Sequence, residues 1–237
     1  MRVLALDPST AACSAAIRDS DMPAGHLVVR RFEKMDRGQS EALAPMVQAV
    51  LRDAGLAVGD MDFVAVTTGP GAFTGVRIGL AMARALGVSA GLPVLGISTL
   101  LAVAHGVPQA ERSDAWMVIV MDTKRDDVYV QVFDPTLSPV GEPEIIVPEA
   151  VSAVLNRIPG GAAILIAGDA VDRVSAHIAG MDRPIRMLPG IILPDAAVVA
   201  EIGMAMGPPT PDMPPPAPIY LRPPYAKVSP TGGKLRP

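Results

Sequence analysis

The sequence predicts an α/β fold made of two lobes that share one order of elements. Two short apolar runs, residues 3–6 and 118–121, each end in an aspartate, Asp7 or Asp122, and a polar turn and a second extended run follow each of them. Judged from hydrophobic spacing, both halves of the chain have three strands, a helix, a strand and a second helix. A length of 237 residues, 50% of them hydrophobic, suffices for one large core or two small ones.

In the first lobe, residues 1–108, three extended runs precede any helix and are typical of an antiparallel meander: residues 3–6, 13–18 and 26–32. Ser40 is a candidate N-cap, and the helix after it has apolar residues at helical spacing, namely Leu43, Met46, Val47, Val50 and Leu51. The lobe then continues with a strand at 63–67, a glycine-rich turn, a helix of small residues at 76–88, a strand at 94–97 and a helix at 99–104.

The second lobe, residues 109–207, is predicted to continue the same plan. Its expected elements are strands at 116–121, 128–133 and 144–147, a helix at 148–158, a strand at 163–167 and a helix after Asp169. A last helix at about residues 195–206 can pack on either lobe. Residues 208–237 are rich in proline and suit neither a helix nor a central strand, so we expect an extended linker or docking arm.

Charge and composition exclude several classes of function. A net charge of −4 gives no global positive field that would draw the chain alone onto nucleic acid or an anionic membrane. A single cysteine, Cys13, excludes an internal disulfide and favours a reducing cytoplasm. His26, His105 and His177 are too far apart for a zincin-type site, and neither Ser40 nor Cys13 has a base placed beside it. We expect no catalytic residue and no metal ligand.

One uncharged segment is long enough to span a bilayer. Residues 85–110 contain no Asp, Glu, Lys or Arg. Gly91 and Pro93 interrupt this segment and indicate a turn that leads into a short strand. We interpret it as a buried helix, turn and strand, and expect no membrane span.

Two turns are candidates for binding the phosphates of a nucleotide. Asp7, Ser9 and Thr10 follow a strand, where a carboxylate can hold Mg²⁺ and amides can face an anion. An Asx-type turn, in which a side chain caps the hairpin backbone, is the alternative at equal weight. In the second turn, Gly69 and Gly71 allow close approach of a backbone to a phosphate, although the Lys-Ser or Lys-Thr pair of a P-loop is missing.

The helix after the second turn has a stripe of small residues. Gly75, Gly79 and Ala83 are spaced four apart and therefore share one face, with Arg77 and Arg84 beside it. Such a stripe lets another helix approach closely. The alternative is packing on the lobe's own sheet.

Five segments together resemble the TsaB (YeaZ) family, within the actin, Hsp70 and sugar-kinase-like superfamily: LALDPST (4–10), GPGAFTGVRIG (69–79), GISTL (96–100), MDTKR (121–125) and IYLR (219–222). The resemblance covers nearly the whole length, and the glycine-rich block is its most specific part. It implies that both lobes are ribonuclease-H-like.

The resemblance further implies that the chain is a required partner of TsaD. TsaD is the catalytic homologue that transfers threonylcarbamoyl onto the adenosine beside the anticodon of tRNAs reading codons that begin with A. Alignment on Gly96 places Thr99 and Val103 where TsaD has two metal-binding histidines, and neither side chain can replace imidazole. The chain is therefore expected to be a cytoplasmic, non-catalytic scaffold that activates TsaD, helps to contact TsaE and reaches tRNA only through the complex.

The family's two first-lobe helices pack as a bundle against their counterparts in TsaD or in a second copy of the chain. The resemblance thus implies a heterodimer with TsaD, a homodimer in its absence, and an interface formed by Leu43, Met46, Val47, Val50, Gly75, Arg77, Gly79 and Ala83. On this interpretation, Gly79→Arg would abolish complex formation and leave a folded monomer.

The resemblance also bears on nucleotide binding. The family implies ADP or ATP at the boundary with TsaD, with Asp7, Ser9, Thr10, Gly69 and Gly71 as the candidates in this chain, which itself requires no cofactor. The alternative function is a stand-alone phosphotransferase of the same superfamily that uses Mg-ATP held by Asp7 and Asp122.

Overall fold

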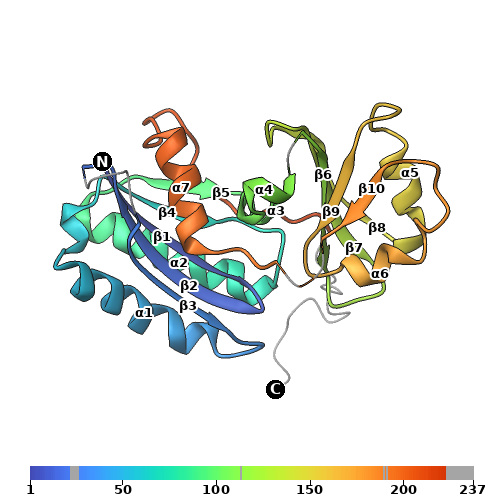
Figure 1. The fold of residues 1–237 in the computed structure, drawn as a ribbon. Coiled ribbons are helices and arrows are strands. Elements are labelled where there is room, and N and C mark those ends of the chain that lie inside the picture. Colours follow the sequence, from blue (N-terminus) through green and yellow to red (C-terminus); the bar gives the residue numbers. More distant parts are fainter. Residues whose placement is uncertain (22–26, 113, 189, 191, 223–237) are drawn as a thin grey trace, which may run out of the picture.

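The computed structural model describes residues 1–21, 27–112, 114–188, 190 and 192–222. Its described residues form two five-stranded mixed sheets that lie side by side, each with helices packed against it (Figure 1). The α/β class and the two-lobed plan predicted from the sequence are confirmed.

The first sheet has the strand order β3-β2-β1-β4-β5. The chain enters through three antiparallel strands, β1 (Arg2–Thr10), β2 (Ala12–Asp19) and β3 (Leu27–Lys34). Two further strands, β4 (Phe63–Thr67) and β5 (Val94–Ile97), continue the sheet in parallel with β1.

Helices cover both faces of the first sheet. On one face lie α1 (Gln39–Ala54) and α2 (Phe73–Ala90), and on the other lies α7 (Ala196–Met206). The 3₁₀ turn η1 (Val58–Asp60) precedes β4. Because both faces are covered, β1 reads as a continuous apolar run: Leu4 packs under α1 and α2, whereas its neighbour Val3 packs under α7.

The position of α7 settles the question that the sequence left open. This helix is N-capped by Asp195, whose side chain accepts a hydrogen bond from the amide of Ala197. The amide of Ala196 donates to the hydroxyl of Ser14 on β2 over 2.9 Å. The last helix therefore packs on the first lobe, which is one of the two alternatives that the sequence left open for the end of the range 109–207.

The second sheet has the strand order β10-β9-β6-β7-β8. Its strands are β6 (Trp116–Asp122), β7 (Val128–Phe133), β8 (Pro139–Ile146), β9 (Ile164–Ala167) and β10 (Ile185–Met187). The sequence did not predict β10, which pairs in parallel with β9 over three residues. So short a strand shows no periodicity of its own.

The helices of the second lobe are short. They are α4 (Gln109–Arg112), α5 (Val151–Leu155) and α6 (Val171–Ser175). The predicted helix at 148–158 was too long, because a 3₁₀ turn, η2 (Pro148–Ala150), takes its first turn and α5 ends at Leu155. Within the described ranges, each helix is too short or too polar to cross a bilayer.

Helix α3 (Thr99–Gly106) joins the two lobes. Leu100 and Val103 pack in the core of the second lobe against residues of β6 and β7. Ala102, on another side of the same helix, packs with α7 in the core of the first lobe. The lobes therefore share a buried apolar connection at α3.

Candidate functional site

Asp7 lies inside the first lobe and its carboxyl is fully buried. Its Oδ1 accepts hydrogen bonds from the Ser9 amide (3.2 Å), the Ser9 hydroxyl (2.5 Å) and the Thr67 hydroxyl (2.7 Å). Burial raises the pKa of Asp7, and the bonds from Ser9 and Thr67 only partly oppose that rise. The geometry is that of the Asx-type turn.

The glycine-rich loop closes onto this turn. The amide of Ala72 donates to the carbonyl of Ser9 over 2.7 Å, and the amide of Thr99 donates to the carbonyl of Gly69 over 2.8 Å. A Cβ on Gly71 would lie 2.3 Å from the Ser9 carbonyl oxygen. The glycines thus permit contact between two pieces of this chain. The prediction that Asp7, Ser9, Thr10, Gly69 and Gly71 form a phosphate site lacks the open turn it requires, because the turn and loop are bonded to each other.

The aspartate of the second lobe is also engaged. Asp122 Oδ1 accepts from Arg173 Nη1 and from the Lys124 amide, both at 2.8 Å, and Lys124 Nζ lies 3.2 Å from Oδ2. Burial alone would raise the pKa of Asp122, but the bonds from Lys124 and the charge of Arg173 outweigh it and lower the pKa. The phosphotransferase alternative would place Asp7 and Asp122 on Mg²⁺. Asp122 already has cationic partners, whereas Asp7 is bonded through Oδ1 alone and its Oδ2 is buried without a hydrogen-bond partner in the described part of the chain.

Thr99 and Val103, which correspond to the histidines of the catalytic homologue, take part in internal packing rather than in metal binding. Thr99 is buried and its hydroxyl lies 3.3 Å from that of Ser9, and Val103 is part of the apolar core. Among the described residues, no three His, Cys, Asp or Glu side chains are grouped as metal ligands would be. Burial raises the pKa of the Cys13 thiol to about 12, so it is a poor nucleophile at neutral pH.

The stripe of small residues faces inward. A Cβ on Gly75 would lie 2.1 Å from the Pro8 carbonyl oxygen, and one on Gly79 would lie 2.9 Å from Pro8 Cδ. Ala83 is fully buried. Of the two interpretations of this stripe, packing on the lobe's own sheet is the correct one. The expectation that Gly79→Arg leaves a folded monomer is wrong, since the new side chain would enter the core.

The apolar residues assigned to the interface on α1 are also internal. Leu43, Val47 and Val50 pack in the first-lobe core, and none is more than 4% exposed. Of the eight predicted interface residues, Met46 and Arg77 lie at the surface, half-buried and exposed respectively. The other six predicted interface residues face the core of the first lobe, so they are not available to a partner in this fold.

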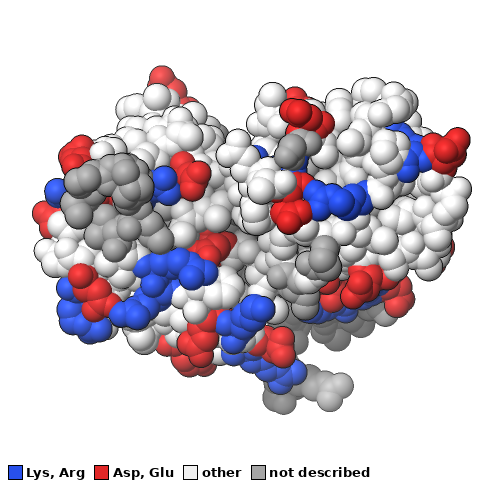
Figure 2. Space-filling view, viewed as in Figure 1, with Lys and Arg blue, Asp and Glu red and all other residues white. Residues whose placement is uncertain are grey.

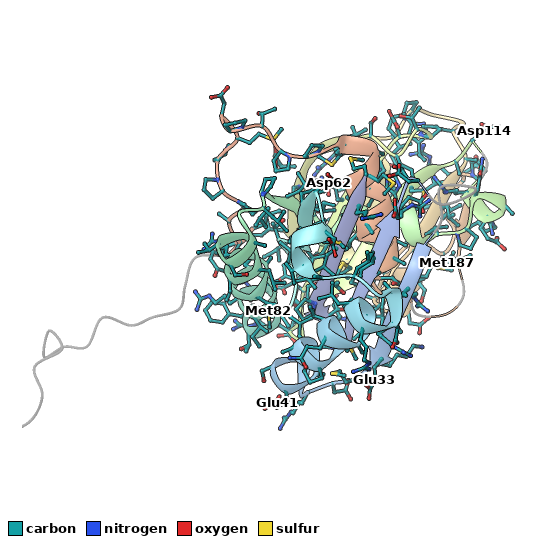
Figure 3. All side chains as sticks on the ribbon, turned by 90° about the vertical axis from the view of Figure 1, so that its left-hand side faces the viewer. Glu33, Glu41, Asp62, Met82, Asp114 and Met187 are labelled. Carbon is teal, nitrogen blue, oxygen red and sulfur yellow. The ribbon has the colours of Figure 1, made fainter. Side chains whose placement is uncertain are left out.

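The opposite side of α1 and α2 presents a different set of residues. We call it the outer helix face; its exposed or half-buried members are Pro45, Met46, Ala49, Ile78, Ala81, Met82, Ala85 and Val88. Met46 and Met82 rest on the same core from the two helices, and Figure 3 shows α1 and α2 side by side near Met82. Val88 is 87% exposed. All eight residues are uncharged and apolar, as the buried centre of a protein interface requires.

Charged side chains are spread over the visible surface. Figure 2 shows acidic and basic side chains mixed over both lobes, without one large basic patch. On α2, the guanidiniums of Arg77 and Arg84 are engaged by the C-terminal segment. Five outward residues of α2 were not predicted from the sequence, although their helical spacing opposite the glycine stripe was the available signal: Ile78, Ala81, Met82, Ala85 and Val88.

A two-lobed fold with one mixed sheet in each lobe and an aspartate on each first strand, Asp7 on β1 and Asp122 at the end of β6, is typical of the actin, Hsp70 and sugar-kinase-like superfamily. A hexokinase of Thermus thermophilus matches with a TM-score of 0.51 at 13% identity, covering 86% of this chain and 98% of that one. A likeness at this identity shows the fold alone.

The particular family follows from closer matches. YeaZ from Pseudomonas aeruginosa matches with a TM-score of 0.74 at 28% identity, over 93% of this chain and 99% of that chain. The TsaB protein of Escherichia coli is 36% identical over 129 residues, 54% of this chain and 53% of that protein. The family model for tRNA N6-adenosine threonylcarbamoyltransferase (TsaD) matches residues 33–181. The chain belongs to the TsaB (YeaZ) family.

Another relative matches over nearly the whole chain. An uncharacterized protein of Mycobacterium tuberculosis is 34% identical over 227 residues, 95% of this chain and 93% of that protein. The chain spans only about half the length of the E. coli TsaB that it matches.

Asp7→Asn tests whether the buried carboxyl is neutral in the fold. The pKa of Asp7 is higher in the folded protein than in the unfolded chain. Its contribution to stability is therefore fully present below the unfolded-state pKa and is lost as the pH rises through the folded-state pKa. Asparagine cannot ionise, so the melting temperature of the variant, relative to the parent, is expected to increase from pH 4 to pH 8 in thermal denaturation.

Asp134→Asn supplies a control of opposite sign. A hydrogen bond from the Thr136 hydroxyl lowers the pKa of Asp134, so its stabilising effect is present at higher pH and is lost on acidification. This variant should become relatively less stable as the pH rises. A flat or falling difference for Asp7→Asn would contradict a neutral carboxyl.

Proposed function

We propose that this chain acts in the biosynthesis of threonylcarbamoyladenosine in tRNA as a non-catalytic activating subunit of TsaD. Membership of the TsaB family and the match of a TsaD family model support this role. The observation that carries the non-catalytic part is the state of the aspartates on the first strand of each lobe. Asp7 is fully closed off from solvent, with Oδ1 bonded to Ser9 and Thr67, and Asp122 already has cationic partners.

The outer helix face is the proposed contact with TsaD. It is two helices wide and carries apolar side chains from Pro45 on α1 to Val88 on α2, with the exposed Arg77 and Arg84 beside it on α2. Interface cores are depleted in charge and enriched in methionine, and Met46 and Met82 meet that description. A homologue of the same fold presents two helices in the same arrangement, so the two pairs can pack as a four-helix bundle. In the absence of TsaD, a second copy of this chain takes the same place.

The remaining partners follow from the same assembly. The chain has a net charge of −4, so tRNA is expected to bind the assembled complex rather than this subunit alone. TsaE is proposed to bind the heterodimer, and ADP or ATP to occupy the boundary between the two subunits. Because the proposed substrate is tRNA, we expect the complex to act in the cytoplasm.

Omission of this chain from a reconstituted reaction tests the proposal. Purified TsaD and TsaE of the same organism are incubated with tRNA, ATP and a threonylcarbamoyl donor, with and without the chain. Modified adenosine, measured by mass spectrometry of digested tRNA, is expected to fall to background without it. Modification by this chain alone, or full modification in its absence, would contradict the proposal. ATP turnover by the isolated chain would favour the phosphotransferase alternative.

A further inference from the structure

The C-terminal segment after α7 does not extend away from the molecule as a free linker. Residues 207–222, which we call the strap, run along the first lobe beside α2 and β5. The amide of Ile219 donates to the carbonyl of Thr68, at the end of β4, over 2.8 Å. Arg84 Nη2 of α2 donates to the carbonyl of Pro216 over 2.7 Å. A Cβ on Gly96 of β5 would lie 2.7 Å from Pro216 Cβ, so the strap packs directly on this strand.

The composition of the strap suits this role. Its extended path is set by the prolines at 208, 209, 211, 214, 215, 216 and 218, which lack an amide donor and restrict the backbone before it docks. Fewer conformations are lost on docking, so a few contacts suffice to hold the segment. Ile219 and Tyr220, which follow the prolines, make the anchoring contacts.

An aromatic and guanidinium cluster fixes the strap to the start of α2. Arg77 Nε donates to the hydroxyl of Tyr220 over 2.7 Å. The Arg77 guanidinium lies 3.5 Å from the centre of the Phe73 ring and 5.5 Å from that of Tyr220. The two rings are 5.9 Å apart. Stacking of this kind is stronger than either contact alone, because the cation faces two rings and its donor is satisfied.

The end of the strap reaches the second lobe. Arg222 Nη2 pairs with Asp127, in the turn between β6 and β7, and both side chains are largely shielded, at 24% and 21% exposure. Asp127 is itself held in place: its carboxylate accepts from the Thr123 hydroxyl, and its carbonyl accepts from Arg173 Nη1. Figure 1 shows the strap, in red, passing from the first lobe toward the second. One continuous segment therefore bonds to α2 and β4 in one lobe and to a rigid turn in the other.

This connection is separate from the one made by α3. The chain also returns from Leu188 in the second-lobe core to α7 on the first lobe, so the strap is a further attachment between the lobes. Two lobes joined by few segments can rotate as rigid bodies, and each additional attachment opposes that rotation. The strap passes the carboxyl end of β4, the edge where open α/β sheets bind ligands, and ties the lobes together there.

We propose that the strap acts as an intramolecular clasp, a segment that holds the two lobes in one relative orientation. The Tyr220 cluster attaches it to the first lobe, and the Arg222–Asp127 ion pair attaches it to the second. The clasp is a property of this chain and does not depend on what binds the outer helix face. The clasp restricts rotation of one lobe relative to the other.

Lobe orientation can be measured directly in the full chain. Spin labels are attached through Ala57→Cys in the first lobe and Ala153→Cys in the second, both exposed positions, while the native Cys13 is buried and fully shielded. Pulsed electron paramagnetic resonance is expected to give one narrow distance distribution for the parent. Arg222→Ala and Tyr220→Ala should each broaden it clearly. Arg157→Ala, which removes an ion pair with Glu144 within the second lobe, is the matched control and should leave it narrow.

Hydrogen exchange supplies the second measurement on the same variants. In Arg222→Ala, the amide of Ile219 and the amides of the turn at 123–127 are expected to exchange about tenfold faster or more, since both ends of the clasp open together. Asp127→Ala should give the same increase, and the double variant should add little to it. Unchanged distances with unchanged exchange, or fully additive effects of the two substitutions, would overturn the clasp.

Discussion

Gly75→Ala is expected to destabilise the first lobe by about 3 kcal/mol, the upper part of the usual range for forcing a methyl group into a filled interior. The added Cβ would lie 2.1 Å from the carbonyl oxygen of Pro8 and 3.2 Å from its carbonyl carbon, and both are backbone atoms that cannot rotate away. Helix α2 would have to separate from β1, which disrupts the core shared by Leu6, Val66 and Leu80.

The direction of the stability change in Gly75→Ala is informative, because helix propensity alone predicts an increase in stability and the clash with Pro8 predicts a decrease. Alanine is favoured over glycine in helices, by about 1 kcal/mol at interior positions, and the same sign applies to Gly75 in the first turn of α2. If the stripe faced solvent, Gly75→Ala would therefore stabilise the protein. Urea denaturation of the variant distinguishes the two cases, since the midpoint is expected to decrease when Gly75 packs against Pro8.

Gly59→Ala is the matched control for that substitution. A Cβ on Gly59 would have no heavy atom within 4 Å, and the residue has an ordinary backbone angle. Its effect should remain within about 0.5 kcal/mol, as is usual for surface positions. A similar loss of stability in both variants would show that close packing against Pro8 is not the cause.

Much of the fold was predictable because its strands are buried on two sides. Runs such as those of β4 and β9 contain only apolar residues and threonine, and a strand covered on both faces shows this pattern without any homologue. The last helix was predictable as a helix but not in its position. Its docking depends on Ser14 and on the packing of α7 against β1 and β2, about 180 residues earlier in the chain.

The orientation of α2 shows where sequence reasoning fails. Small and apolar residues occur on both of its sides: Gly75 and Gly79 face Pro8, whereas Ala81 and Ala85 face outward. Periodicity identifies a helix with two weakly polar faces but does not choose between them, because glycine serves equally for close packing on a sheet or on another helix. The position of Pro8, in the β1–β2 hairpin, determines which side of α2 is buried.

The sequence left open, for a related reason, whether the proline-rich segment is a linker or a docking arm. Proline-rich composition excludes a helix or a central strand, and says nothing about whether an extended segment docks. The contacts that hold it come from Arg77, Arg84 and Asp127, which lie far away in the sequence and look like ordinary surface charges. A pairing of Tyr220 with a residue more than a hundred positions earlier has no local signal.

Ala81→Arg is expected to weaken binding to TsaD at least about 100-fold while leaving the fold of this chain intact. Ala81 is exposed near the middle of the outer helix face, so the monomer accepts a longer side chain there without a clash. In the complex, the guanidinium would be removed from water without a partner in the centre of an apolar contact, and such burial costs several kcal/mol. Sedimentation velocity with purified TsaD measures the loss, and circular dichroism verifies the fold.

Ala153→Arg makes the same chemical change on α5, an exposed helical position in the second lobe. It should leave TsaD binding unchanged, because the proposed contact involves α1 and α2 alone. Equal loss in the two variants would indicate a general effect of added charge, and undiminished binding of Ala81→Arg would place the contact elsewhere. The pair therefore separates the outer helix face from the rest of the surface. Since Gly75→Ala acts on the opposite side of α2, the two sides of one helix are tested independently.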